Sequence, residues 1–467
     1  MQEEILFCPS FVLLCQLELF QNHVTILTKT RGYDHFNLFE VLKMETKEIV
    51  SKLQNDKEIP LFARLYGNSY EGQRERYQKA ISKFEELFGE GLDVKIYSAP
   101  GRTEIGGNHT DHQQGSVLAG AVNLDAIAIV HFNNKGFINL KSEGFDMVTI
   151  ALDDTKPHPG ELGTAAIVRG IAARFMEKGV QIGGFDAYCT SDVMCGGGIS
   201  SSAAFETLVC TIIDEQYNKE RCNALEIARI GWFAETTYFG KKCGLLDQTV
   251  SAYGGLVGID FSDVANPIID TIDYDFSKSG YTLCITDTKS SHEDLTDDYV
   301  AIREEMEAIA DFFGERVLSR VDEDKFYESI PKLREVITDR AVMRAAHFFA
   351  ETKRAKMEAS ALKNGYFEKF LELVNESGES SASLLQNLYS VKHPTKQDLP
   401  LAIMISKKVL KGRGAVRVHG GGFAGTIQAF VPNDLVDEYV REVEKIFGEN
   451  TCHRLTVRSV GGTEVKI

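Results

Sequence analysis

The residues best suited to chemistry in this chain lie in three segments punctuated by glycine. They are 100–111, which reads PGRTEIGGNHTD, 196–204, which reads GGGISSSAA, and 420–425, which reads GGGFAG. The first gathers several polar side chains, the second offers backbone NH groups and hydroxyls to an anion, and the third lets the backbone approach a ligand closely. Together they predict a site for a sugar and a nucleotide.

Phosphate groups are expected at the second segment. Successive NH groups at a helix start, together with hydroxyls and the helix dipole, favour negative charge at 196–202. The apolar run over 203–213 predicts the helix that holds this loop in place. A flexible loop is the alternative for such a sequence on its own. The chain contains no GxxxxGK[ST] sequence, which excludes a Walker-type ATPase.

The third segment matches the GxGxxG fingerprint of dinucleotide-binding proteins in its letters only. That fingerprint opens a helix, whereas residues 420–425 precede 426–431, whose residues predict a strand. We therefore expect a tight turn between two strands, with the backbone passing close to a bound ligand.

Length and composition limit the class of protein. The 467 residues suit two domains of ordinary size, and 43% apolar and 25% charged residues are typical of a globular chain. The net charge of −17 and the lack of a face dense in Lys and Arg argue against nucleic acid as a partner. We expect small-molecule partners and a monomer.

The cysteines indicate a reducing compartment. There are nine, without a CxxC pair, which predicts free thiols and does not support a zinc site. The apolar stretch 7–20 is interrupted by Pro9, Gln16 and Glu18 and lacks the basic lead of a secretion signal. No stretch is long enough for a membrane-spanning helix. These features favour a cytoplasmic protein with no membrane partner.

The elements that must position the three segments form a mixed pattern without the repeating βαβ order of a doubly wound sheet, which predicts an α+β fold. A strand over 94–98 is expected to place the first segment on a loop, and a strand over 184–189 leads into the second. Further strands are expected at 118–130, 136–142, 281–286, 414–418, 426–431 and 453–457. Helices are expected at 77–88, 164–178, 203–213, 223–239, 297–313, 331–351, 367–375 and 434–447.

Three regions are expected along the chain. Residues 1–43 show no clear period, whereas Met44 opens an ordinary amphipathic stretch, so we expect Met44 to be the natural start. A genuine extension that packs on the surface is the alternative. The pattern loosens around 260–280, which predicts an N-terminal sugar- and phosphate-binding domain over 44–270 and a C-terminal α+β domain over 271–467.

From about residue 72 to its C-terminus the chain resembles the galactokinases, in the superfamily that also contains homoserine, mevalonate and phosphomevalonate kinases. The resemblance rests on PGRxxxxGxHTD at 100–111, GxGxSSSAA at 196–204, CGxxDQ at 243–248 and GGGFxG at 420–425. It implies a two-domain fold with a ribosomal-protein-like N-terminal α/β domain and a ferredoxin-like C-terminal α+β domain. It also implies phosphorylation of galactose at the C1 hydroxyl with ATP and Mg²⁺.

The resemblance assigns roles to matching residues. Asp247 matches the proposed base for the C1 hydroxyl, and Arg102 matches the arginine that keeps it ionised and counters charge on the transferring group. Ser202 and Glu235 match the Mg²⁺ ligands. The phosphate loop comprises Gly196, Gly197, Gly198, Ile199, Ser200, Ser201 and Ser202, and the sugar contacts are Asn108, His109, Asp111, Gly244 and Tyr299.

Phosphoryl transfer needs groups of these kinds. It requires positioning, Mg²⁺, positive charge near the developing negative charge, and a carboxylate for the hydroxyl proton. One hydroxyl and one carboxylate suffice for Mg²⁺ when phosphate supplies further oxygens. An aspartate beside an arginine has a lowered pKa, so Asp247 acts either as a weak base or by orienting the hydroxyl. Considered singly, Glu235, His109 and Tyr299 are also explained as a solvated carboxylate, a structural hydrogen-bonding group and a packing residue.

Asn108 departs from the galactokinase pattern, which usually has Glu at this position to accept a hydrogen bond from the C6 hydroxyl. Asn keeps an acceptor but loses the charge and one methylene. Loss of a carboxylate also removes repulsion towards a C6 acid, so a galacturonate-type substrate is an alternative. An Asn108→Glu change is therefore expected to sharpen the preference for galactose.

Other departures bear on details of the nucleotide and the loops. His112, His419 and Ala424 stand where Tyr, Thr and Gly are usual. A galactokinase-like sensor that binds sugar and ATP without catalysis is a further alternative. Such sensors have lost residues of the SSSAA loop, whereas here that loop, Arg102 and Asp247 are all present, which favours an enzyme.

Overall fold

The structure is a computed structural model that describes residues 19–20, 23–24, 44–55, 59–67, 70–193, 198–241, 243–290 and 295–467. Residues 1–43 and 44–467 are separate units. In the first unit, the described residues form two short antiparallel strands, β1 (Leu19–Phe20) and β2 (His23–Val24). The predictions for residues 1–43, and those for Gly196 and Gly197, otherwise fall outside the described residues.

The larger sheet is organised around two long strands, β4 and β5, which pair antiparallel. Among the described residues its strands are β3 (Met44–Glu45), β4 (Asp93–Gly106), β5 (Ser116–Phe132), β6 (Phe137–Ser142), β7 (Met147–Ala151), β8 (Phe185–Ser191), β9 (Leu256–Asp260), β10 (Ile268–Ile272) and β15 (Thr463–Glu464). The first part of β5 pairs with β9 and its last part with β8, so strands far apart in sequence meet on it. β15 pairs with β4, which brings the end of the chain back to this sheet.

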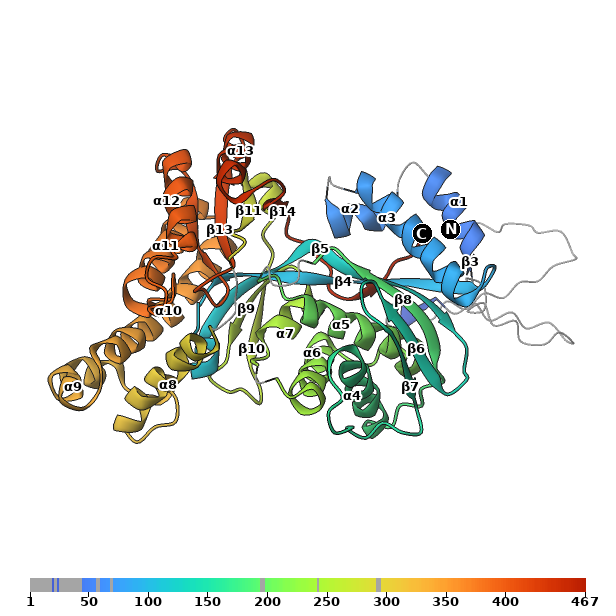
Figure 1. The fold of residues 1–467 in the computed structure, drawn as a ribbon, viewed down its shortest axis with the longest axis horizontal. Helices are drawn as coiled ribbons and strands as arrows, with labels where there is room; N and C mark the ends of the chain where they lie inside the picture. The colour runs from blue at the N-terminus through green and yellow to red at the C-terminus, as the bar shows by residue number, and fades with distance from the viewer. Residues whose placement is uncertain are drawn as a thin grey trace, which may run out of the picture. The chain divides into compact units, whose positions relative to one another are not determined.

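Helices cover both faces of the larger sheet (Figure 1). One face carries α1 (Thr46–Asn55), α2 (Pro60–Tyr66) and α3 (Glu71–Phe88), and the other carries α4 (Gly163–Glu177), α5 (Ser201–Ile213), α6 (Ala224–Phe233) and α7 (Leu246–Tyr253). Alternate residues of β5 pack into the hydrophobic cores on opposite faces of the sheet. Ile127 and Ile129 pack in the core that includes Phe62 of α2, whereas Ala128 packs in the core that includes Leu208 of α5.

The smaller sheet has the order β12-β13-β11-β14 and is antiparallel throughout. Its strands are β11 (Tyr281–Asp287), β12 (Ala415–His419), β13 (Thr426–Pro432) and β14 (Cys452–Leu455). The helices of this part are α8 (Thr296–Phe312), α9 (Glu323–Val336), α10 (Asp339–Lys363), α11 (Phe367–Ser380), α12 (Asp398–Leu410) and α13 (Val436–Phe447). Both sheets are mainly antiparallel, with β6 and β8 a parallel pair, so the predicted α+β fold is confirmed.

The predicted domain boundary near residue 270 lies where the chain passes from β10, in the larger sheet, to β11, in the smaller one. Because β15 returns to the larger sheet, residues 271–467 do not all belong to the smaller sheet and its helices. The division into two domains stays a prediction. None of the helices in the described ranges is long and apolar enough to cross a membrane.

The loop expected at residues 100–111 is mostly strand. β4 continues to Gly106 because its pairing with β5 persists through two register shifts, between Pro100 and Arg102 and between Glu104 and Gly106. Such irregularities change the direction in which nearby side chains point. The loop itself begins at Gly107, so Arg102 and Glu104 are held by a paired strand.

Several predicted elements have different bounds. The single helix expected at 331–351 is two helices, because Thr338 starts a new one by accepting a hydrogen bond from the Ala341 NH group. The helix expected at 223–239 ends at Gly240 as predicted, but its last part, 234–239, is π-helical. The pattern did not predict α12 or the strands β7, β9 and β10.

Candidate active site

A cavity of about 690 Å³ brings residues of the first and third glycine-rich segments together with the CGxxDQ segment. β4 and the loop after it contribute Arg102, Glu104, Asn108, His109 and Asp111; the start of α7 and the residues before it contribute Gly244, Asp247 and Gln248; the turn between β12 and β13 contributes Gly420 and Gly421. Strand pairing and a helix start therefore gather groups that are more than three hundred residues apart in sequence.

Asp247 is held by two partners at the wall of this cavity. Arg102 Nε donates to Asp247 Oδ1 at 2.7 Å, and Ser200 Oγ donates to Oδ2 at 2.6 Å. Burial opposes ionisation of Asp247, but the charge of Arg102 and the hydrogen bonds from Arg102 and Ser200 outweigh it, so its pKa lies below the ordinary value of 3.8. The carboxylate is therefore ionised at neutral pH, as the sequence predicted for an aspartate beside an arginine.

The second segment opens a helix in the way that the sequence predicted. Ser200 adopts a left-handed conformation with φ of 59°, and α5 begins at Ser201. The Ser200 hydroxyl does not cap the helix, because it is engaged by Asp247. Arg102 also donates to the Gly198 carbonyl oxygen. The described part of the loop, Gly198–Ser202, is thus tied to the two predicted catalytic residues.

Ser202 and Glu235 come together from two helices. Ser202 Oγ lies 3.3 Å from Glu235 Oε1, and Lys241 Nζ donates to the same oxygen at 2.6 Å. The side chain of Glu235 is almost fully buried, whereas that of Lys241 is half exposed. A hydroxyl and a carboxylate at a helix start fit Mg²⁺, which takes few protein oxygens when a phosphate supplies others. Among the described residues no cluster of three or more His, Cys, Asp or Glu could hold a metal.

A second buried carboxyl group, that of Glu206, shares a hydrogen-bond donor with Glu235. Gln248 Nε2 donates to Glu206 Oε2 at 2.9 Å and to Glu235 Oε2 at 2.8 Å. Burial, and then repulsion by Glu235, raise the pKa of Glu206 well above its ordinary value. Burial beside a second carboxyl group thus favours the protonated form of Glu206.

A second cavity, of about 420 Å³, adjoins the first. Its walls come mainly from β8, α4 and α5, and include apolar side chains such as Ile167, Val193 and Phe205 as well as Ser202. Glu235 and Lys241 line both cavities. A largely apolar pocket that meets a polar one at a helix start has the character of a nucleotide site beside a smaller polar substrate.

The predicted sugar contacts surround the larger cavity, but some of their polar atoms are engaged by the protein. His109 Nε2 lies 2.8 Å from the Gly421 carbonyl oxygen, and the Tyr299 hydroxyl donates to the Gly422 carbonyl oxygen at 2.8 Å. Burial, and then repulsion by Glu104, raise the pKa of Asp111. A Cβ atom at Gly244 would stand 2.6 Å from Asp111 Oδ2, so a larger residue at this position would displace the Asp111 side chain.

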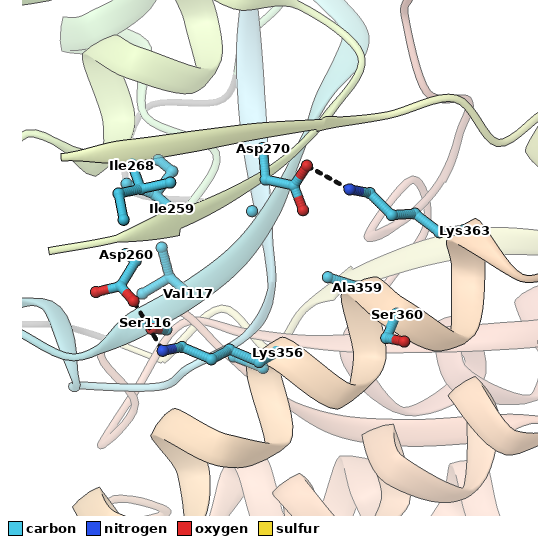
Figure 2. Close-up of a pocket in the computed structure, with 12 residues that line it drawn as sticks. Ser116, Val117, Ile259, Asp260, Ile268, Asp270, Lys356, Ala359, Ser360 and Lys363 are labelled. Atoms are coloured by element: carbon cyan, nitrogen blue, oxygen red, sulfur yellow. Dashed lines mark hydrogen bonds and ion pairs between the residues drawn. The ribbon is translucent and has the colours of Figure 1, made fainter.

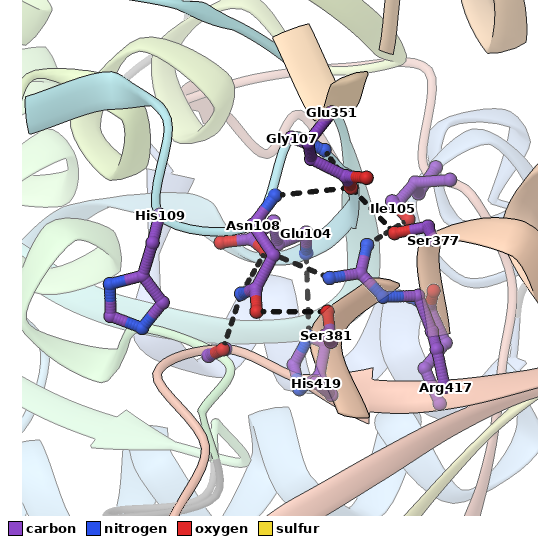
Figure 3. A network of polar contacts seen from close by, with 12 residues as sticks. Glu104, Ile105, Gly107, Asn108, His109, Glu351, Ser377, Ser381, Arg417 and His419 are labelled. Atoms are coloured by element: carbon purple, nitrogen blue, oxygen red, sulfur yellow. Dashed lines mark hydrogen bonds and ion pairs between the residues drawn. The ribbon is translucent and has the colours of Figure 1, made fainter. Parts of the chain in front are cut away.

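The Asn108 side chain is fully buried in a polar network (Figure 3). Its Nδ2 donates to Glu104 Oε1 and to the Gly420 carbonyl oxygen, while its Oδ1 accepts from Asn387 and Ser381. From α10, Glu351 Oε1 accepts from the Gly107 NH group at 3.0 Å. The loop after β4 is thus held from the C-terminal part of the chain.

The sequence analysis assigned no role to Lys241, Glu206, Gln248 or Glu104. Glu104 and Gln248 lie inside two of the motifs, so the sequence already indicated that they are near the site. Lys241 follows a predicted helix end and carries no such signal, because its role depends on the distance to Glu235.

A third cavity, of about 400 Å³, lies between α10 and the edge of the larger sheet (Figure 2). Lys356 Nζ reaches Asp260 Oδ2 at 2.7 Å, and Lys363 pairs with Asp270. These ion pairs join the helix to β9 and β10. This cavity is a junction between elements, and Asp247 is not among the residues that line it.

Comparison with known proteins shows the family of this chain. The galactokinase galactose-binding signature matches residues 82–132, and the GHMP kinases N-terminal domain matches residues 166–255. The galactokinase of Glaesserella parasuis serovar 5 is 30% identical over 379 residues, which cover 79% of this chain and 92% of that protein. The chain belongs to the galactokinase family. A Bacillus subtilis galactokinase is 28% identical over 378 residues.

Solved structures support the family fold. The galactokinase of Lactococcus lactis, in complex with galactose, superposes with a TM-score of 0.69 at 23% identity and covers 82% of this chain and 98% of its own. The mevalonate kinase of Methanococcus jannaschii superposes with a TM-score of 0.54 at 15% identity, covering 78% of this chain and 98% of its own. The sequence-based assignment to the galactokinases, within the superfamily that includes mevalonate kinases, is confirmed.

Proposed function

We propose that this galactokinase-family enzyme transfers the γ-phosphoryl group of ATP to the C1 hydroxyl of a hexose, most simply galactose. The observation that carries the proposal is the ionised Asp247, held between Arg102 and Ser200 where the larger cavity meets the loop before α5. A carboxylate fixed beside a hydroxyl substrate and a phosphate loop is the arrangement that this transfer needs.

Separate residues bind the sugar, orient its C1 hydroxyl and counter the charge that develops during transfer. The sugar occupies the larger cavity, against His109, Asp111, Gly244 and Tyr299, with its C1 oxygen towards Asp247. That oxygen forms a bond to the γ-phosphorus, the bond from phosphorus to the bridging oxygen breaks, and ADP leaves with the electron pair. Asp247 orients the hydroxyl and accepts its proton, while Arg102 counters negative charge on the transferring group.

The nucleotide side uses the loop before α5 and the neighbouring cavity. The NH groups and hydroxyls of the loop, Gly196–Ser202, hold phosphate oxygens at the positive end of the helix. Ser202 and Glu235 would hold Mg²⁺, which supplies charge neutralisation for the phosphates when bound. The base of the nucleotide lies in the apolar cavity lined by Phe205 and Ile167. We place the reaction in the cytoplasm, which fits the free thiols of the described cysteines.

A coupled assay of ADP release tests this function. The purified chain is given MgATP and a panel of galactose, glucose, galacturonate and homoserine. The proposal expects galactose to give the highest kcat/KM. Binding of ATP and galactose without ADP release would instead make the protein a sensor, and preferred turnover of galacturonate would replace galactose by a sugar acid.

A further inference from the structure

The position where galactokinases usually present a sugar-binding carboxylate is used here for another purpose. Asn108 is fully buried. Its Nδ2 donates to Glu104 Oε1 at 2.9 Å and to the Gly420 carbonyl oxygen at 2.7 Å. Its Oδ1 accepts from Asn387 Nδ2 at 2.9 Å and from Ser381 Oγ at 3.4 Å. An amide has two N–H donors and one oxygen with two lone pairs, so its capacity is filled. A sugar hydroxyl would have to displace one of these protein partners.

A different carboxylate faces the cavity four residues earlier. Glu104 lies on β4 and lines the cavity together with Arg102, Asp111 and Asp247. Its Oε1 accepts from Asn108 and, at 3.3 Å, from Arg417 Nη2, while within the described ranges no hydrogen bond engages Oε2. The side chain is 10% exposed, so the carboxylate is held on one side and open on the other.

Two departures from the galactokinase pattern meet at Glu104 (Figure 3). Asn108 donates to its carboxylate, and His419 Nε2 accepts from its backbone NH group at 3.3 Å. Burial, together with the charges of Arg102 and Arg417, lowers the pKa of His419 well below its ordinary value, so the ring is neutral and Nε2 is free to accept. The residue at 108 therefore holds the carboxylate of Glu104, and the residue at 419 holds its backbone.

We propose that Glu104 is the specificity-determining carboxylate of the sugar site, that it accepts a hydrogen bond from a ring or C6 hydroxyl of the hexose, and that Asn108 and Arg417 hold it in place. This inference rests on the proposed function. It decides between the two substrates left open by the sequence. The carboxylate of a uronic acid would have to lie against the carboxyl group of Glu104, which would repel it, whereas a hydroxyl there can donate to it. The site therefore selects a neutral hexose.

The size of the effect follows from the kind of bond. A hydrogen bond to a charged group contributes enough that its loss changes kcat/KM by about tenfold to about a hundredfold. Glu104→Gln keeps the shape of the side chain and an acceptor oxygen, but removes the charge. We expect the loss to appear mainly in KM, because the contact is made in the bound sugar before transfer as well as during it.

The experiment measures kcat/KM for galactose, for the deoxygalactoses that each lack one hydroxyl other than that at C1, and for galacturonate. It compares the wild type, Glu104→Gln and the control Asp260→Asn, which removes a carboxylate from β9 at the junction with α10. We expect Glu104→Gln to have a lower kcat/KM than the wild type on galactose. On the one deoxygalactose that lacks the contacted hydroxyl, we expect the variant and the wild type to have the same kcat/KM. We also expect its activity on galacturonate relative to galactose to rise, and Asp260→Asn to match the wild type.

An equal loss in Glu104→Gln on galactose and on every deoxygalactose would overturn the contact and leave Glu104 a structural partner of Asn108. If that variant melts below the assay temperature, Glu104→Asp keeps the charge beside Arg417 and is held to the same comparison. If the wild type turns over none of the sugars, the proposed function fails separately. Calorimetric galactose binding then replaces turnover, and equal affinity in wild type and variant would overturn the inference.

Discussion

The variant Asp247→Asn distinguishes two roles of Asp247, as a general base and as a group that only orients the sugar hydroxyl. The variant has nearly the shape of the wild type, because Asn Oδ1 still accepts from Arg102 at the position where the distance is 2.7 Å. The amide NH₂ replaces the oxygen that accepts from Ser200, and the serine hydroxyl turns to accept from it. What is lost is the negative charge and the ability to take a proton.

The expected size of the loss differs between the two roles. General base catalysis contributes about a hundredfold to about ten-thousandfold in rate, which is about 2.7 to 5.4 kcal/mol of transition-state stabilisation. A neutral hydrogen bond that only orients the hydroxyl contributes about 0.5 to 1.5 kcal/mol, or at most about a tenfold change. We expect kcat to fall by at least about a hundredfold.

The assay is ADP release under saturating galactose and MgATP, with nucleotide affinity measured by calorimetry. We expect the affinity for ATP to change little, because Asp247 lines the sugar cavity rather than the nucleotide cavity. Asp260→Asn serves as the matched control. A kcat within about tenfold of the wild type would refute the role of Asp247 as base and leave it as an orienting group.

Three further perturbations test other parts of the account. Glu235→Gln should raise the Mg²⁺ concentration for half-maximal rate by about tenfold or more, and an unchanged Mg²⁺ titration would exclude Glu235 as a ligand. Asn108→Asp sets a carboxylate against Glu104 and the Gly420 carbonyl oxygen, so urea unfolding should show a loss of about 3 kcal/mol or more; equal stability would contradict the buried network. Burial, and then repulsion by Glu351, raise the pKa of Glu358 above 4.5, so its stability contribution is complete below that pH and is lost as the pH rises through the raised value. Glu358→Gln should therefore flatten the fall of Tm towards alkaline pH, and a parallel fall in both proteins would refute the shift.

The motifs named residues that the structure brings together, because each motif carries its chemistry in a short stretch. Arg102, Ser200 and Asp247 were named from three separate segments, and the structure joins them by two hydrogen bonds of Asp247. The turn at 420–425 was also predicted correctly, since the residues that follow it alternate as a strand. Local sequence contains this information because turn chemistry and strand periodicity are local properties.

Direction and burial of side chains were not predictable in the same way. The loop expected at residues 100–106 is strand, because pairing with β5 decides it, and that pairing is not local. The change Asn108→Glu looked favourable from sequence, but in the structure the longer carboxylate would meet Glu104 and a carbonyl oxygen, so we now expect it to destabilise the fold. Lys241 was missed for the same reason, since only the folded chain brings it to Glu235.

The most direct test of the account is to identify the product formed from galactose and MgATP. Phosphorus NMR of a reaction with galactose labelled with carbon-13 at C1 shows whether the phosphate is bonded at that position, through its coupling to the labelled carbon. The account predicts one sugar phosphate, coupled to C1, formed in equal amount to ADP. A product phosphorylated at another carbon, or no sugar phosphate despite binding of both substrates, would contradict it.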